Sequence, residues 1–279
     1  MNQSPYVVYT SDKSGAKGLG IWKDMFRELR KSKELIIRLF LRDLIGRYKQ
    51  SLFGYFWVLI NPFVAIGTFI LLNRAGILNI RPTDIPYPLF ALIGLSVWQL
   101  FSGGVTIGSH SILAAGSMIS KINFPREALV FSAMGQVIFD FLVRFCLVIL
   151  LFIVFKFVPS WGILLFPFAL IPLILLTLGL SMILSVINAV VRDTMNMISI
   201  LLTFCMFLTP VLYPVPIRFS RLFKFNPLSP LITAPRDLIA YGHIKEPTGF
   251  VIMSVVSVLV FLVCWQIFHL AETKLPERM

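Results

Sequence analysis

Residues 42–57 read RDLIGRYKQSLFGYFW and continue without a linker into VLINPF at residues 58–63. The first half of this stretch is basic and amphipathic, whereas the second half is aromatic and apolar. An apolar run that starts beside a cluster of cations marks the place where a membrane begins. The junction therefore predicts a basic helix on one face of a membrane that leads directly into the first span.

The composition of the whole chain supports a membrane protein. Of its 279 residues, 57% are hydrophobic and only 14% are charged, which is unlike a soluble domain. Several apolar runs reach the roughly 20 residues that cross a hydrocarbon core of about 30 Å. We expect an all-α polytopic membrane protein with six transmembrane helices, at residues 52–72, 89–113, 128–155, 163–191, 195–212 and 250–270.

The N-terminal arm has its own pattern. Between residues 19 and 44, apolar side chains recur at helical spacing and basic side chains fill the other face, as in helices that lie in the headgroup plane. We divide the chain into a flexible cytoplasmic N-terminus (1–18), an amphipathic interface and coupling helix (19–50), a six-helix transmembrane domain (51–272) and a cytoplasmic tail (273–279). The arm is either a passive anchor or a moving lever.

Charge predicts the orientation. Lysine and arginine are concentrated in the arm, and cytoplasmic segments carry such an excess, so we expect both termini in the cytoplasm. Anionic headgroups beside the first span explain the net charge of +12, and we expect no nucleic-acid partner. The first span is expected to serve as the insertion signal, because residues 1–40 lack the apolar core of a cleavable signal peptide.

The sequence contains no convincing nucleotide-binding or metal-binding motif. GAKGLG at residues 15–20 lacks the spacing and the Lys-Ser/Thr ending of a phosphate-binding loop, so we do not expect the chain to hydrolyse ATP. The three cysteines fall inside apolar runs and show no disulfide or metal-binding spacing. We therefore expect no metal site and no cofactor.

One pair of charges falls inside a predicted span. Asp140 and Arg144 are four residues apart, hence on one face of a helix. A lone charge is costly in hydrocarbon, so we predict an intramembrane ion pair between them. Proton relay is the alternative, although a carboxylate beside a guanidinium is a poor proton carrier.

Aromatic residues and prolines suggest a path and a gate. Aromatic rings stack on the apolar faces of sugars, and a lining of this kind is one interpretation of Phe56, Trp57, Phe63, Trp98, Phe204, Phe207 and Tyr213; interfacial belts and lipid-facing rings are the other. Residues 226–241 are half apolar but too short and proline-broken to span. We predict re-entrant helices on the outer face between spans five and six, with an ordinary amphipathic surface loop as the alternative.

Four segments occur together in one order. They are RYKQSLFG at 47–54 followed by Trp57 and Pro62, KINFPRE at 121–127, Arg192-Asp193 followed by TPVLYP at 209–214, and NPLSPLI at 226–232 followed by Arg236-Asp237. Together they resemble the transmembrane subunits of ABC transporters that export bacterial cell-surface polysaccharides such as O-antigen, capsule or teichoic acid. The resemblance covers about residues 40–270. Phe53 and Thr209 depart from the usual Leu and Ser, which affects only local packing.

The resemblance implies a homodimer in the bacterial inner membrane whose two copies line one pore for a lipid-linked glycan. Each copy would bind a separate cytosolic ATPase subunit, and that subunit would hold ATP and Mg. The coupling residues would be Arg47, Tyr48, Lys49, Lys121, Phe124, Pro125, Arg126 and Glu127. The periplasmic gate would contain Pro210, Pro214, Asn226, Pro227, Pro230, Arg236 and Asp237.

Two other functions remain open at this point. The first is ABC export of a drug or small lipid. The second is a membrane enzyme acting on lipid-linked sugars, which needs acidic or histidine groups that converge near the interface; in the sequence His110, His243 and His269 look isolated. We expect a transport subunit, with O-antigen as the best substrate, and not an enzyme.

Overall fold

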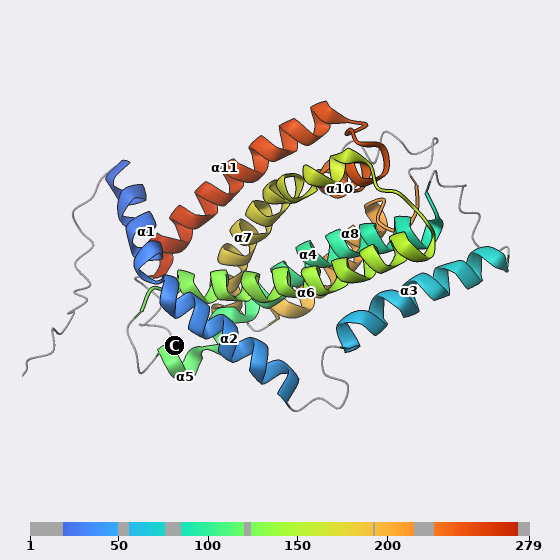
Figure 1. The fold of residues 1–279 in the computed structure, drawn as a ribbon. Coiled ribbons are helices and arrows are strands. Elements are labelled where there is room, and N and C mark those ends of the chain that lie inside the picture. The colour runs from blue at the N-terminus through green and yellow to red at the C-terminus, as the bar shows by residue number, and fades with distance from the viewer. Residues whose placement is uncertain are drawn as a thin grey trace, which may run out of the picture.

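The computed structural model describes residues 19–49, 56–75, 85–119, 124–191, 193–214 and 226–272. Every regular element in these ranges is a helix (Figure 1), which confirms the all-α prediction for this part of the chain. The elements are α1 (Leu19–Lys31), α2 (Lys33–Lys49), α3 (Phe56–Arg74), α4 (Tyr87–Ala114), α5 (Gly116–Ile119), α6 (Glu127–Val154), the 3-10 turn η1 (Trp161–Leu164), α7 (Phe166–Val190), α8 (Thr194–Leu208), α10 (Leu228–Tyr241) and α11 (Pro247–Glu272).

Four helices are long and apolar enough to cross a membrane. They are α4 and α6 with 28 residues each, α7 with 25, and α11 over Pro247–Ala271; at 1.5 Å per residue each exceeds the hydrocarbon thickness of about 30 Å. The predicted spans at 52–72 and 195–212 correspond to shorter apolar stretches, Pro62–Leu72 in α3 and Thr194–Leu208. The count of six spans therefore stays a prediction.

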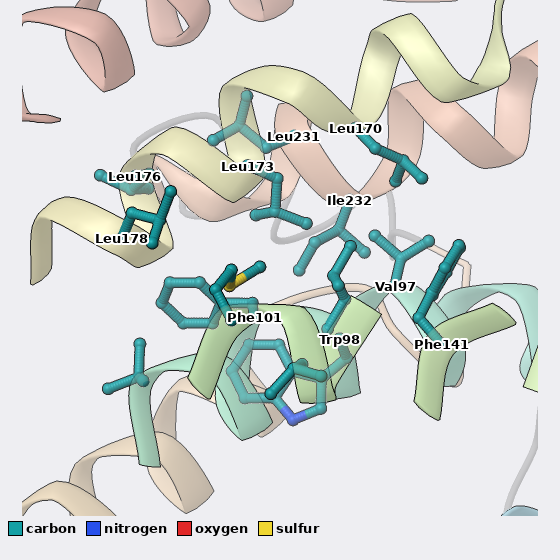
Figure 2. Close-up of a cluster of buried hydrophobic side chains, with 14 of the residues drawn as sticks. Val97, Trp98, Phe101, Phe141, Leu170, Leu173, Leu176, Leu178, Leu231 and Ile232 are labelled. Atoms are coloured by element: carbon teal, nitrogen blue, oxygen red, sulfur yellow. The ribbon is translucent and has the colours of Figure 1, made fainter. Parts of the chain in front are cut away.

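Helix α4 is the centre of the bundle. It packs between α6 and α7, and α11 packs against α7, while α2 lies across α6 (Figure 1). In the most apolar stretch of α4, 72% of the residues are buried, whereas in that of α11 only 17% are buried. Figure 2 shows one part of the core, made of aromatic and branched side chains that include Trp98 and Phe101 of α4, Phe141 of α6, Leu173 of α7 and Ile232 of α10.

Small residues allow α4 and α7 to pack closely. A β-carbon at Gly104 would collide with Thr177, and one at Gly108 would lie 2.6 Å from the β-carbon of Ser181. The Ser181 hydroxyl donates a hydrogen bond to the Gly104 carbonyl at 3.0 Å. Glycines one turn apart let two helix backbones approach in this way. Gly104 and Gly108 therefore allow α4 and α7 to pack closely.

The helix ends define two ends of the bundle. At the arm end, α1, α2 and α5 lie beside the start of α6 and the end of α11. At the α10 end, Tyr87 at the start of α4 donates to the Leu212 carbonyl at 3.0 Å, and η1 packs against α10. Helix α10 stops at Gly242, whose φ of +79° suits glycine. A β-carbon there would also collide with Ser160, which follows α6.

Candidate functional site

The first candidate site is a polar contact between α2 and α6 at the arm end. Arg47 Nη1 donates to Asp140 Oδ2 at 2.9 Å, and Arg47 Nη2 donates to Gln136 Oε1 at 2.6 Å. Gln136 and Asp140 lie one turn apart on α6, so one guanidinium reaches both. The Asp140 side chain is only 8% exposed, against 32% for Arg47. A buried acceptor on a long apolar helix is thus bound by a cation of the amphipathic arm.

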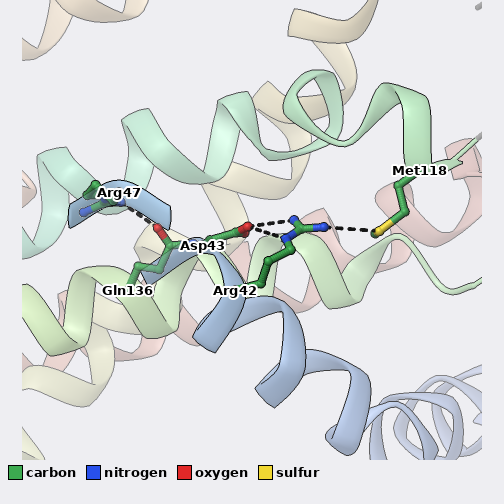
Figure 3. A network of polar contacts seen from close by, with 5 residues as sticks. All are labelled: Arg42, Asp43, Arg47, Met118 and Gln136. Atoms are coloured by element: carbon green, nitrogen blue, oxygen red, sulfur yellow. Dashed lines mark hydrogen bonds and ion pairs between the residues drawn. The ribbon is translucent and has the colours of Figure 1, made fainter. Parts of the chain in front are cut away.

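The same network continues to α5 (Figure 3). Gln136 Nε2 donates to Asp43 Oδ2 at 3.4 Å, and Arg42 Nε donates to Asp43 Oδ1 at 2.7 Å. The other side of the Arg42 guanidinium contacts Met118 Sδ at 3.3 Å. Because α5 precedes the predicted coupling segment at 121–127 and α6 follows it, α2 contacts the helices on both sides of that segment.

Aromatic packing reinforces the contact between α2 and α6. Phe40 and Phe139 meet edge to face with ring centroids 6.5 Å apart. A β-carbon at Gly135 would lie 3.2 Å from the Phe40 ring, so the glycine makes room for it. Burial of rings in this geometry stabilises a contact beyond the area removed from solvent.

The predicted coupling residues differ in position. Phe124 and Pro125 are half-buried, whereas Arg126 is 7% exposed and Glu127 is fully buried. Lys121 lies outside the described residues, and so do the side chains of Tyr48 and Lys49 at the end of α2. The side chains of Arg126 and Glu127 therefore face the inside of the protein. A contact of the segment with an ATPase stays a prediction.

Glu127 instead belongs to a second polar cluster at the arm end. Its Oε1 atom lies 2.9 Å from His269 Nδ1 and accepts a hydrogen bond from Trp265 Nε1 at 3.2 Å. Glu28 of α1 brings a second carboxylate to the same place, within 4.8 Å of the ligand atoms of Glu127 and His269. The sequence interpretation of His269 as an isolated histidine is therefore wrong.

Trp265 is also the centre of an aromatic cluster that joins three helices. Its ring meets those of Trp22 and Phe26 of α1, Phe131 of α6 and Phe261 of α11, with centroid distances between 5.0 and 6.2 Å. Trp265 is 1% exposed. The amphipathic arm is thus docked on the bundle by α1 as well as by α2.

A third candidate site lies at the α10 end and contains predicted gate residues. The Arg236 guanidinium sits 3.8 Å from the centroid of the Phe90 ring, and its Nη1 donates to the Pro210 carbonyl at 3.1 Å. Burial lowers the pKa of Arg236 to about 10, so the guanidinium is charged at neutral pH. Burial raises the pKa of the Asp237 carboxyl, and the neighbouring Arg236 opposes that shift.

Asn226 connects the end of α8 to the start of α10. Its side-chain amide donates to the Leu208 carbonyl and to the Thr209 hydroxyl, both at 2.9 Å, and its Oδ1 accepts from the Leu228 amide at 3.0 Å. Pro210 and Pro230 are buried, Pro214 is half-buried, and Pro227 is exposed. The structure thus brings Pro210, Asn226 and Arg236 together, and a gating role stays a prediction.

The aromatic residues that we interpreted as a translocation path are dispersed. Trp98 is 3% exposed and lies in the core (Figure 2), whereas Phe63, Phe204 and Phe207 are 46%, 64% and 59% exposed. Tyr213 is half-buried, and the side chains of Phe56 and Trp57 are outside the described residues. The path itself stays a prediction.

Asp140, one member of the predicted intramembrane ion pair, also makes a contact with a residue that is distant in the sequence. Asp140 and Arg144 are both buried on α6, as expected for charges inside an apolar helix. The printed sequence shows no reason to connect Asp140 with Arg47, which is 93 residues away. Sequence reasoning also missed four other site residues: Glu28, Asp43, Gln136 and Trp265. They lie near helix ends or opposite the amphipathic arm, and only these positions could have indicated that they belong to a site. The pairing of Asp140 with Arg144 stays a prediction.

Comparison of the sequence with known proteins identifies a family. Residues 34–240 match the ABC-2 type transporter family. The chain is 28% identical over 261 residues to the O-antigen export system permease protein RfbA of Myxococcus xanthus, covering 91% of this chain and 99% of that protein. It is 32% identical over 246 residues to the protein of the same name from Klebsiella pneumoniae, covering 82% and 91%. It is 23% identical over 231 residues to the polysialic acid transport protein KpsM of Escherichia coli, covering 77% and 84%.

Proposed function

Because this chain belongs to the ABC-2 type transporter family, we propose that it is the permease subunit of an exporter that moves a lipid-linked polysaccharide, with O-antigen as the best candidate. The observation that carries this proposal is the match to O-antigen export permeases over 82–91% of this chain. The chain acts as a transport subunit and not as an enzyme. A separate ATPase subunit binds ATP and Mg, and this chain holds no cofactor for transport.

The proposed membrane arrangement has six spans, α3, α4, α6, α7, α8 and α11, in the bacterial inner membrane. The arm end faces the cytoplasm, as the density of cations in the arm supports. Helix α10 is a re-entrant gate helix on the periplasmic side. Its burial against α4, α7 and α11 supports this assignment, because backbone of this kind at membrane depth has to pack against protein or face water.

Force from the ATPase enters at the arm end. We assign the docking surface to residues 121–127 together with the end of α2, and two ATPase subunits act on two copies of the permease. Movement of α2 changes the position of Arg47 relative to Gln136 and Asp140, and so moves α6. The buried side chains of Arg126 and Glu127 carry the movement inward to α11, since Glu127 contacts both Trp265 and His269.

The glycan path runs between the two copies. Exposed rings such as Phe204 and Phe207 on α8 are available to line it, and a sugar chain slides along aromatic faces without forming fixed hydrogen bonds. Gating at the α10 end then depends on the Arg236 contacts with Phe90 and Pro210.

The experiment is deletion of the gene in its own host, followed by separate measurement of surface glycan and of lipid-linked glycan inside the cell. We expect surface glycan to disappear and the lipid-linked form to accumulate, with recovery on re-expression. Normal surface glycan in the deletion strain would exclude the proposed substrate and favour export of a drug or small lipid. Glycan movement into liposomes containing the purified chain but no ATPase subunit would contradict the proposed energy source, and chemical turnover of a lipid-linked sugar by that chain would favour an enzyme.

A further inference from the structure

Glu28, Glu127 and His269 come from three different helices and converge at the arm end. Glu28 belongs to α1, Glu127 is the first residue of α6, and His269 lies in the last turn of α11. One potential ligand atom from each lies within 4.8 Å of the others, and Glu127 and His269 are buried. Among the described residues this is the group of acidic and histidine side chains whose arrangement fits a metal ion. The proposed transport coupling uses the contacts of Glu127 with Trp265 and His269, but it gives no role to Glu28, which converges on the same two ligand atoms.

The state of the Glu127 carboxylate points to a missing ligand. Its Oε1 atom is bound by His269 and Trp265, but its Oε2 atom is buried and has no hydrogen-bond partner in the part of the chain that is described. The residue is 0% exposed. A fully buried carboxylate oxygen without a partner is strongly unfavourable, and the start of a helix relieves only part of that charge.

We propose that Glu28, Glu127 and His269 bind a divalent transition-metal ion of the Zn²⁺ type. An imidazole nitrogen with two carboxylate oxygens suits Zn²⁺ and its neighbours, whereas Mg²⁺ and Ca²⁺ prefer oxygen ligands alone. The ion gives the buried Glu127 Oε2 atom a partner. Three protein ligands leave the fourth tetrahedral position to water.

The distances suit this ion after small side-chain adjustments. Bonds of about 2.0–2.2 Å in a tetrahedron place ligand atoms roughly 3.3–3.6 Å apart. His269 Nδ1 and Glu127 Oε1 are 2.9 Å apart, and the widest separation in the group is at most 4.8 Å. Glu28 is half-buried and its backbone belongs to α1, so the adjustment concerns its side chain alone.

The ion would fasten the arm to the bundle. It links α1 to the first residue of α6 and to the end of α11, beside the aromatic contacts of Trp265 with Trp22 and Phe26. In the metal-bound protein α1 therefore resists separation from α11, and removal of the ion loosens this attachment without breaking the contact of α2 with α6.

The test is metal binding by the purified full-length chain in detergent after treatment with EDTA. Co²⁺ is titrated first, since its visible absorption reports tetrahedral nitrogen and oxygen ligands, and Zn²⁺ is then used to displace it. We expect one ion per chain. The variants are Glu28→Gln, Glu127→Gln and His269→Gln, and the matched controls are Glu34→Gln and His243→Gln, both at exposed positions.

Each ligand variant should bind Co²⁺ at least about tenfold more weakly than the wild type, because even outer-shell partners of a metal site contribute about 10–100-fold in affinity. The two controls should bind like the wild type. Hydrogen exchange in α1 should slow when Zn²⁺ is added to the wild type and should not change in Glu28→Gln.

Three results would overturn the proposal: no stoichiometric Co²⁺ or Zn²⁺ binding by the wild type, equal binding by the ligand variants, or loss of binding in a control. If Glu127→Gln does not fold, Glu28→Gln decides, because Glu28 is only half-buried and its exchange for glutamine keeps the side chain's shape. None of these readouts requires transport, so their failure is distinct from failure of the proposed export function.

Discussion

The Arg47 guanidinium lies 2.9 Å from the Asp140 carboxylate, although 93 residues separate them in the chain. One belongs to the amphipathic arm and the other to the interior of an apolar 28-residue helix. Separation of α2 from α6 would leave the buried Asp140 carboxylate without this cation, which is unfavourable.

Arg47→Gln should therefore destabilise the protein by about 1–3 kcal/mol, since Asp140 stays buried with a weaker partner. The free energy of unfolding in detergent measures this effect, and a double-mutant cycle with Asp140→Asn should show coupling between the two sites. The control is Arg38→Gln, which removes the ion pair with Glu34. Both of those side chains are about three-quarters exposed, so the change should be under about 0.5 kcal/mol. Additive effects of the two Arg47 and Asp140 substitutions would contradict the assigned contact.

Gly108→Ala should destabilise the packing of α4 against α7 by about 1–3 kcal/mol, because the new β-carbon would meet the Ser181 β-carbon at 2.6 Å. Gly103→Ala is the matched control on the same helix, since its β-carbon would make an ordinary 3.6 Å contact with Val137. Thermal unfolding in detergent compares the two. Addition of Ser181→Gly to Gly108→Ala should restore stability, and no recovery would place the clash elsewhere.

Arg236→Lys should weaken the α10 end by about 1–3 kcal/mol, because lysine loses the planar stack over Phe90 and the geometry of the bond to Pro210. Unfolding in detergent and leakage of a small solute from liposomes are the two measurements. Lys245→Gln removes an exposed cation over the Tyr241 ring and should cost no more than about 1 kcal/mol. Equal effects of both substitutions would show that burial of Arg236 is unimportant.

Trp265→Ala should cost about 3–5 kcal/mol, the range for removal of a large buried aromatic side chain. It should also accelerate hydrogen exchange throughout α1, because Trp22 and Phe26 lose the ring against which they pack. Trp161→Ala is the control, since Trp161 is 87% exposed and its loss should change stability by under about 0.5 kcal/mol. Unchanged exchange in α1 of the Trp265 variant would mean that α2 alone attaches the arm.

Local sequence patterns predicted the elements better than their contacts. Apolar runs identified α4, α6, α7 and α11 because hydropathy and length are properties of one segment. The spacing of Gly104 and Gly108 is a local pattern of the same kind, because it places both glycines on one helix face. The predicted spans at 52–72 and 195–212 likewise overlap α3 (Phe56–Arg74) and α8 (Thr194–Leu208).

For each candidate site at the arm end, the sequence predicted one residue of the contact but not its partner. Arg47 and Glu127 stood out in ordered motifs, but their partners did not, since Gln136 and His269 are 89 and 142 residues away in the chain. Which face a helix turns toward another depends on the packing of the whole bundle. The buried side chain of Glu127 shows the consequence: a residue expected in a surface segment contacts α11 instead.

The central position of α4 also bears on how the protein is made. Helix α4 is the least hydrophobic of the four long apolar helices, and the more hydrophobic α6 and α7 come after it in the chain. The ribosome completes α4 before α6 and α7, the two helices that cover it. The face of α4 that carries Gly104, Gly108 and Ser109 is therefore synthesised before the α7 residues that bury it, and the order of synthesis is the reverse of what the packing requires.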